Sequence, residues 1–153
     1  MKRAVALLSA VFLALVLVSA PASAARDIKM AHVVNENDAF HICALKFKEL
    51  VESGSGGELT VTIYPNAKLG DERNLLESMR MGVVDSAIVT GGPVMNFMPK
   101  FGVFDLPFLF SSPEHAYKVL DGEIGKKMLD DMYAIGWKGL AYGERGFRNL
   151  TNS

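Results

Sequence analysis

The sequence has almost no cysteine. Cys43 is the only one among 153 residues, so an intrachain disulfide and a cysteine-rich zinc cluster are both excluded. Phe40, Cys43, Ala44 and Phe47 follow helical spacing. This pattern predicts that Cys43 lies on the apolar face of a helix, where it packs as an inert core side chain rather than acting as a reactive thiol.

Motifs for metal binding and catalysis are also missing. His32, His41 and His115 are the only histidines, and they lack the close spacing of a zinc motif. The chain has no G-x-S-x-G nucleophile elbow. Neighbouring acidic residues such as Asp71 and Glu72 point apart on a helix and make a poor acid–base pair. These absences argue against an enzyme, although active sites can assemble from distant residues, and no cofactor or metal is predicted.

No apolar run is long enough to cross a bilayer. The run over 4–18 has about 15 residues, whereas a spanning helix needs about 20. It follows two basic residues, Lys2 and Arg3, and precedes the small-x-small sequence Ala22-Ser23-Ala24. This arrangement predicts a signal peptide over 1–24, cut after Ala24, and therefore an exported protein. An uncleaved N-terminal anchor is the alternative.

The chain has no excess of basic charge. It contains 16 basic and 17 acidic residues, and loss of Lys2 and Arg3 with the leader leaves a net charge of about −3. A nucleic-acid partner is therefore not expected, because such a partner requires a basic face. A small anionic ligand remains compatible, since one local arginine can bind an anion within an acidic protein.

What the sequence does contain is an alternation of strand and helix patterns. The predicted strands cover 28–33, 59–64, 83–89 and 137–142, and the predicted helices cover 39–53, 72–81, 113–120 and 123–135. We expect Asp38, Asp71 and Ser112 to be N-caps, and the aromatic connector over 101–110 to be largely buried. The order of elements predicts an α/β fold with a mainly parallel sheet.

Several ordered motifs carry a family resemblance. They are the segments over 28–32, 64–73, 81–85 and 104–110, and Gly146-Phe147-Arg148 with the residues that follow it. Together they resemble the periplasmic solute-binding subunit of a tripartite ATP-independent periplasmic (TRAP) transporter of the DctP type. The resemblance implies a periplasmic receptor, without catalysis, whose two lobes close around a small organic acid for delivery to membrane subunits. It implies a periplasmic-binding-protein-like first lobe over 25–142, a truncated crossover to the second lobe over 143–153, and a further ligand-binding arginine downstream.

The resemblance also suggests which residues bind the ligand. Arg148 is the expected carboxylate partner, because a guanidinium can donate two parallel hydrogen bonds to a carboxylate; its alternative is a surface ion pair with Glu144. Glu72 and Arg73 begin a helix, where free N–H groups favour anions, although simple capping by Asp71 explains the same residues.

His32 and Thr90 are expected at a common sheet edge, because ligands of open α/β folds bind beyond the carboxyl ends of strands. The alternatives are a core histidine and a turn or capping threonine. Relatives that bind sialic acid have a carboxylate where this chain has Thr90, and the difference favours a smaller acid over a sugar acid. Phe147 and Phe97 are candidates to cover an apolar part of the ligand.

Two other interpretations remain open at this stage. One is a secreted α/β enzyme acting on a small carboxylate or ester. The other is a truncated, non-functional product, since the resemblance places this chain within the first half of a longer protein. On the truncation hypothesis, residues 25–153 alone would be marginally folded and would not bind a ligand tightly.

Overall fold

The computed structural model describes residues 25–146, so the predicted signal peptide and the site candidates Phe147 and Arg148 lie outside the described residues. The elements are β1 (Arg26–Ala31), α2 (Ala39–Gly54), β2 (Leu59–Tyr64), α3 (Glu72–Arg80), β3 (Ser86–Ala87), α4 (Gly91–Val94), η1 (Pro99–Asp105), α5 (Pro113–Leu120), α6 (Glu123–Asp131) and η2 (Met132–Ile135). Among these helices, none is long and apolar enough to cross a membrane.

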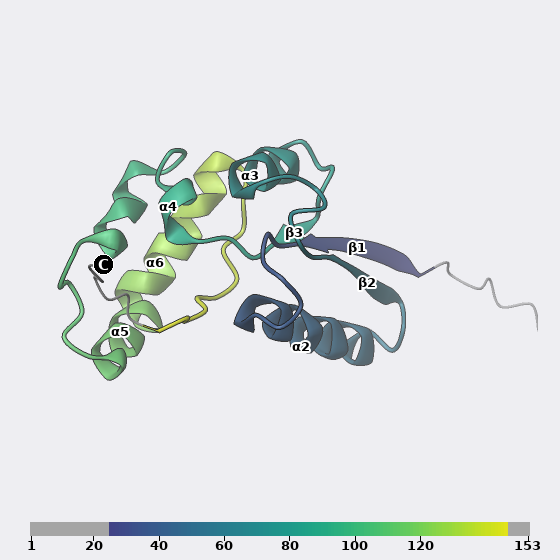
Figure 1. Ribbon diagram of the computed structural model, residues 1–153, viewed down its shortest axis with the longest axis horizontal. Coiled ribbons are helices and arrows are strands. Elements are labelled where there is room, and N and C mark those ends of the chain that lie inside the picture. Colours follow the sequence, from purple (N-terminus) through teal and green to yellow (C-terminus); the bar gives the residue numbers. More distant parts are fainter. Residues whose placement is uncertain (1–24, 147–153) are drawn as a thin grey trace, which may run out of the picture.

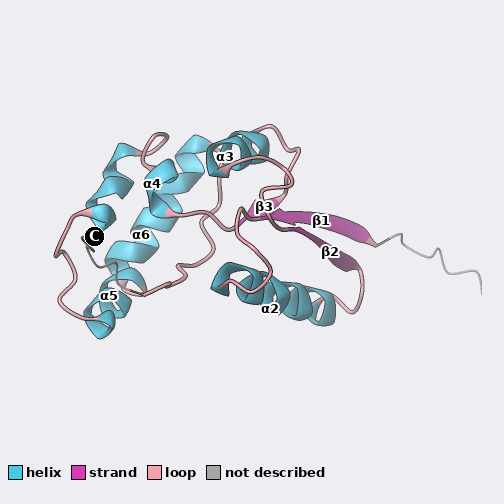
Figure 2. Ribbon diagram, viewed as in Figure 1, coloured by secondary structure: helices cyan, strands magenta, loops and turns pink. Residues whose placement is uncertain are grey.

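The sheet has three parallel strands in the order β2-β1-β3. Met30 of β1 lies opposite Ile63 of β2 on one side and Ser86 of β3 on the other. Helices connect the strands, as parallel pairing requires (Figure 2). The predicted α/β class with a mainly parallel sheet is therefore confirmed.

Side-chain alternation along β1 determines which helix covers which face of the sheet. Met30 packs with Ala44 of α2 and Val61 of β2. Its neighbour Ala31 points the other way and packs with Leu75 of α3. Figure 1 accordingly shows α2 below the two long strands and α3 above them.

A third apolar cluster joins the later helices to the rest of the fold. Leu76 of α3 packs there with Val94, Met98, Phe101, Met132 and Trp137. Phe97 lies against Trp137 with ring centroids 5.0 Å apart, so the structure places Phe97 in this core. In Figure 1 the helices α4, α5 and α6 lie together beyond the carboxyl end of β3, and α4 and α6 contribute residues that line or pack on this cluster.

The third predicted strand is far shorter than expected. Instead of 83–89, only Ser86–Ala87 pairs with β1. Val83 is exposed because it belongs to the turn after α3, where Gly82 has a φ of +70° and the Val83 N–H bonds the carbonyl of Ser78. The apolar run therefore combines a turn with a short strand, which the pattern of residue types does not separate.

The predicted strand over 137–142 does not form. The segment is extended, but within the described residues it joins no sheet. The aromatic residues at its two ends pack on helical elements instead: Trp137 is buried in the third cluster, and Tyr142 stacks near Phe101 with ring centroids 6.3 Å apart. An extended apolar segment can lie against helices as well as within a sheet, and its residue types do not distinguish the two. The helix predicted over 123–135 is also divided, because α6 ends at Asp131 and a 3-10 turn follows.

The prediction for Cys43 is wrong, because its side chain is exposed. The face of α2 that meets the sheet runs through Phe40, Ala44 and Phe47. At 100° per residue, Cys43 is turned about 60° from Phe40, onto the shoulder of the helix. Leu50 lies on the same shoulder and is 58% exposed.

The aromatic connector is only partly buried, which corrects the expectation of a largely buried segment. Phe101 is buried in the third cluster. Phe108 is 98% exposed and has a φ of +60°, a conformation uncommon for a bulky residue. Its neighbours Leu106 and Leu109 are exposed as well.

Candidate functional site

Glu72 and Thr90 meet beyond the carboxyl end of β3. Glu72 is the first residue of α3, and Thr90 immediately precedes α4. Oε1 of Glu72 accepts a hydrogen bond of 2.7 Å from the backbone N–H of Thr90, and Oε2 accepts one of 2.6 Å from its hydroxyl. The structure thus brings together two of the predicted site residues.

The helix cap of α3 and the Glu72–Thr90 contact coexist. Asp71 caps α3 as predicted, since its Oδ1 accepts the N–H of Asn74 at 2.8 Å. The preceding Gly70 has a φ of +107° and lies close to Asn74, so this turn requires glycine. Because Asp71 satisfies the helix start, the carboxylate of Glu72 is free to bridge to Thr90, whose own side chain makes no capping bond.

Arg73 does not join this pair. Its side chain is 69% exposed, and its Nε lies 3.2 Å from Oε1 of Glu77, one turn along α3. Such an exposed pair contributes little to stability. The structure therefore gives Arg73 a surface ion pair within its own helix.

His32 follows β1 directly and is completely buried. Its backbone N–H bonds the carbonyl of Tyr64, and its carbonyl accepts the N–H of Ala67. Its ring nitrogen Nε2 lies 3.0 Å from Nδ1 of His41 in α2, and the two rings meet edge to face. His32 is thus a core residue, yet its ring is oriented by a second histidine rather than by backbone alone.

The buried position of His32 predicts a pH dependence of folding. Burial, followed by the nearby His41, holds the pKa of His32 below its ordinary value of 6.5, while Asp38 and Glu36 partly oppose the shift. The unfolded chain then binds this proton more readily than the folded chain. Its contribution to stability is full above about pH 6.5 and is lost as the pH falls through the folded pKa.

We therefore expect the free energy of unfolding to decrease on acidification from about pH 7.5 to about pH 5, and to decrease less steeply in a His32→Asn variant. Denaturant titrations of both proteins across this range measure the two slopes. Equal slopes would show that His32 does not titrate differently in the folded and unfolded states.

A contact that the sequence did not reveal ties the end of the described chain to α2. Arg145 Nη2 lies 2.6 Å from Oδ2 of Asp38, and its guanidinium lies 4.8 Å from the centre of the Phe40 ring. Asp38 also caps α2 through its Oδ1, which accepts the N–H of Phe40 at 3.0 Å. Both carboxylate oxygens of Asp38 are therefore used, one within the helix and one for the distant arginine.

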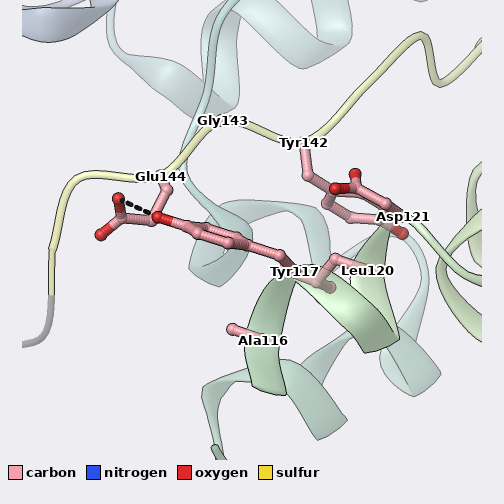
Figure 3. Close-up of a pocket in the computed structure, with 7 residues that line it drawn as sticks. All are labelled: Ala116, Tyr117, Leu120, Asp121, Tyr142, Gly143 and Glu144. Carbon is pink, nitrogen blue, oxygen red and sulfur yellow. Dashed lines mark hydrogen bonds between the residues drawn. The ribbon is translucent and has the colours of Figure 1, made fainter. Parts of the chain in front are cut away.

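A shallow hollow of about 360 Å³ lies between α5 and the extended segment that follows η2. In Figure 3 the ring of Tyr117 extends across it, and the hydroxyl donates a hydrogen bond of 3.0 Å to Oε2 of Glu144. This bond raises the pKa of Tyr117. Burial raises that of Tyr142 to about 12, and its hydroxyl donates to the carbonyl of Gly125 at 2.9 Å.

Glu144 is already engaged within the described residues. Besides the Tyr117 hydroxyl, its carboxylate accepts the backbone N–H of Gly146. The alternative sequence interpretation paired Glu144 with Arg148, which lies outside the described residues. The partners that the structure gives Glu144 thus come from α5 and from its own turn.

A model of bacterial extracellular solute-binding proteins, family 7 (DctP), matches residues 30–153. Among solved structures, the sugar acid binding protein DctPAm from Advenella mimigardefordensis in complex with galactonate is 39% identical, with a TM-score of 0.80 over 84% of this chain and 42% of that one. A TRAP periplasmic solute-binding protein from Polaromonas sp JS666 bound to D-erythronate is 36% identical, with a TM-score of 0.77 over 80% and 40%.

The curated relatives show the same pattern of coverage. The C4-dicarboxylate-binding periplasmic protein DctP from Rhodobacter capsulatus is 37% identical over 127 residues, which are 81% of this chain and 38% of the relative. The chain thus spans about two fifths of the length of the proteins it matches.

Proposed function

Because the chain belongs to the bacterial extracellular solute-binding proteins of family 7, we propose that it forms the first lobe of a periplasmic receptor that captures a small organic acid. Residues 1–24 direct export, 25–142 form the lobe, and 143–153 begin the crossover to a second lobe. The receptor delivers its ligand to the membrane subunits of a TRAP transporter, and lobe closure replaces any catalytic step.

The observation that carries this proposal is the contact between Glu72 and Thr90. It assembles polar groups from two separate elements at the sheet edge where open α/β folds bind ligands. Structural neighbours with TM-scores near 0.8 are described as bound to galactonate and D-erythronate. We therefore place this lobe's share of the ligand site at Glu72 and Thr90, while His32 is a buried residue whose ring meets His41 of α2.

Arg148 completes the proposed site as the partner of the ligand carboxylate, and Phe147 covers an apolar part of the ligand. Arg145 supports this assignment indirectly, because its bond to Asp38 fixes the chain three residues before Arg148. Arg73 is a weaker candidate, since its guanidinium is occupied by Glu77 on the exposed side of α3.

The contact between Glu72 and Thr90 also weakens the reason for disfavouring a sugar acid. That expectation rested on the absence of a carboxylate at Thr90. Glu72 supplies one from α3, at 2.6 Å from the Thr90 hydroxyl. A hydroxylated acid is therefore compatible with this edge of the site.

Thermal unfolding of the full-length parent with a panel of organic acids tests the proposal. One acid is expected to raise the melting temperature, because a ligand that binds only the folded state stabilises it, and chemical assay should recover that acid unchanged. Consumption of the acid would indicate an enzyme, and the absence of any shift would reject the receptor. The codons after Ser153 show whether the reading frame of such a parent continues.

A further inference from the structure

The segment over 138–146 is held by its side chains rather than by its backbone. Among the residues that the structure describes, this segment joins no sheet and forms no backbone–backbone hydrogen bond. Its course therefore depends on a few individual contacts. The hydroxyl of Tyr142 donates to the carbonyl of Gly125 at 2.9 Å, and two further anchors follow at Glu144 and Arg145.

Glu144 and Arg145 are adjacent in the chain, but their side chains contact two different helices. The carboxylate of Glu144 accepts a hydrogen bond of 3.0 Å from the hydroxyl of Tyr117 in α5 (Figure 3). The guanidinium of Arg145 contacts the start of α2 instead, through the carboxylate of Asp38 and the ring of Phe40. The two contacts together tie the end of the described chain to α5 and to α2.

The Arg145 anchor combines an ion pair with a cation–π interaction. Its Nη2 lies 2.6 Å from Oδ2 of Asp38, and its guanidinium lies 4.8 Å from the centre of the Phe40 ring, within the range of about 6 Å over which such an attraction acts. The side chain of Asp38 is only 16% exposed. It is also fixed in place, because its Oδ1 caps α2 by accepting the N–H of Phe40. The helix start therefore orients Asp38, and Asp38 orients the arginine.

We propose that Asp38 is a positioning residue for ligand binding: it holds Arg145, and Arg145 directs the chain so that Arg148 reaches the ligand. The inference rests on the proposed receptor function and adds to it a residue that does not itself touch the ligand. Arg148 follows Arg145 by three residues, which span at most about 11 Å of fully extended chain. An anchor at Arg145 therefore limits where the backbone of Arg148 can lie.

The physical basis is the cost of ordering the chain before Arg148. Without the anchor this chain adopts more orientations, and only a fraction of them suits the ligand. The apparent affinity falls in proportion to that fraction, because ligand binding must then supply the ordering. An ion pair of this exposure together with the cation–π interaction accounts for a loss of about fivefold to thirtyfold.

Asp38→Asn separates this positioning role from helix capping. Asparagine caps a helix about as well as aspartate does, so α2 should keep its start, but the amide has no charge to pair with Arg145. Arg145→Gln removes the other partner. We expect calorimetric titration of the full-length parent, with galactonate, erythronate and succinate as probes, to show that both variants bind the preferred acid about fivefold to thirtyfold more weakly than the wild type.

The losses in the two variants should not add. If Asp38 acts through Arg145, the double variant should bind about as weakly as either single variant, because the second substitution removes no further contact. Arg145→Lys keeps the charge and should bind more tightly than Arg145→Gln. Lys46→Gln is the matched control, since it breaks an exposed ion pair with Glu49 in the same helix and should leave the affinity unchanged.

The outcomes separate this inference from the proposed function. Near-native affinity in Asp38→Asn would overturn the positioning role, whether or not the melting temperature of the ligand-free protein falls. Weak binding by Arg145→Gln alone would indicate that Arg145 contacts the ligand directly, and losses that multiply in the double variant would show that the two residues act independently; either result would overturn the inference while leaving a receptor. Failure of all three acids to bind the wild-type protein would remove the receptor proposal and this inference together.

Discussion

Replacing Arg148 by alanine in the full-length parent is expected to weaken binding of the organic acid by roughly 30-fold to several-thousand-fold. Loss of one partner from a buried, hydrogen-bonded charge pair typically costs about 2–5 kcal/mol, because the ligand carboxylate then lacks its counter-charge. Calorimetric titration gives the dissociation constants directly. Arg148→Lys should also bind poorly, since a point charge does not reproduce the two parallel bonds of a guanidinium.

Arg26→Ala provides a matched control for charge. The Arg26 side chain is 78% exposed, and its closest acidic partner is Asp85 at 3.8 Å. Exposed pairs of this kind contribute about 0–1 kcal/mol, so this substitution should leave ligand affinity nearly unchanged. Near-native affinity in the Arg148→Ala variant would remove Arg148 from the site, and equal losses in both variants would indicate a general charge effect.

Gly125→Ala is expected to destabilise the fold by about 3 kcal/mol, at the upper end of the usual cost of overpacking. Gly125 lies buried in the first turn of α6, and a methyl group built there overlaps the backbone carbonyl of Leu120. A rigid backbone atom does not move aside as a flexible side chain would. The hydrogen bond from Tyr142 to the Gly125 carbonyl further limits a shift of α6.

Gly54→Ala is the matched control, because Gly54 is also a helical glycine, the last residue of α2, and has nothing within 4 Å of an added Cβ. There the same substitution should be neutral or stabilising by about 0.4–1 kcal/mol, since alanine restricts the unfolded chain. Denaturant unfolding of both variants compares the two sites. Equal stabilities would show that α6 adjusts freely around a methyl at Gly125.

The elements that sequence patterns predicted well are those with local signals at their ends. The helix α2 begins after its Asp38 cap, α3 after Asp71, and α5 after Ser112 with Pro113 at its first position. Each of these residues starts or caps a helix within one turn of its own position. The sequence alone therefore indicates where these helices begin.

The failures share a different cause. The segment over 137–142 was predicted to be a strand, and Cys43 has the spacing of a core residue. Whether an alternating segment finds a neighbouring strand, or which side of a helix meets the sheet, depends on tertiary packing rather than on the local pattern. That packing leaves Cys43 exposed and leaves 137–142 without a neighbouring strand among the described residues.

The candidate site was likewise predictable only in part. Glu72 and Thr90 could be proposed individually from the family resemblance, but the hydrogen bonds between them join residues 18 positions apart. The contact of Arg145 with Asp38 spans 107 positions, and no local motif indicates it. The direction of these hydrogen bonds, from Thr90 to Glu72, is known only from the folded geometry.

A crystal structure of the full-length parent with its tightest-binding acid tests the central claim most directly. The account predicts that the acid lies between two lobes, with its carboxylate on the Arg148 guanidinium and a hydroxyl group within hydrogen-bonding distance of Glu72 or Thr90. An acid bound elsewhere, or one whose carboxylate approaches Glu72 while Arg148 faces solvent, would contradict it.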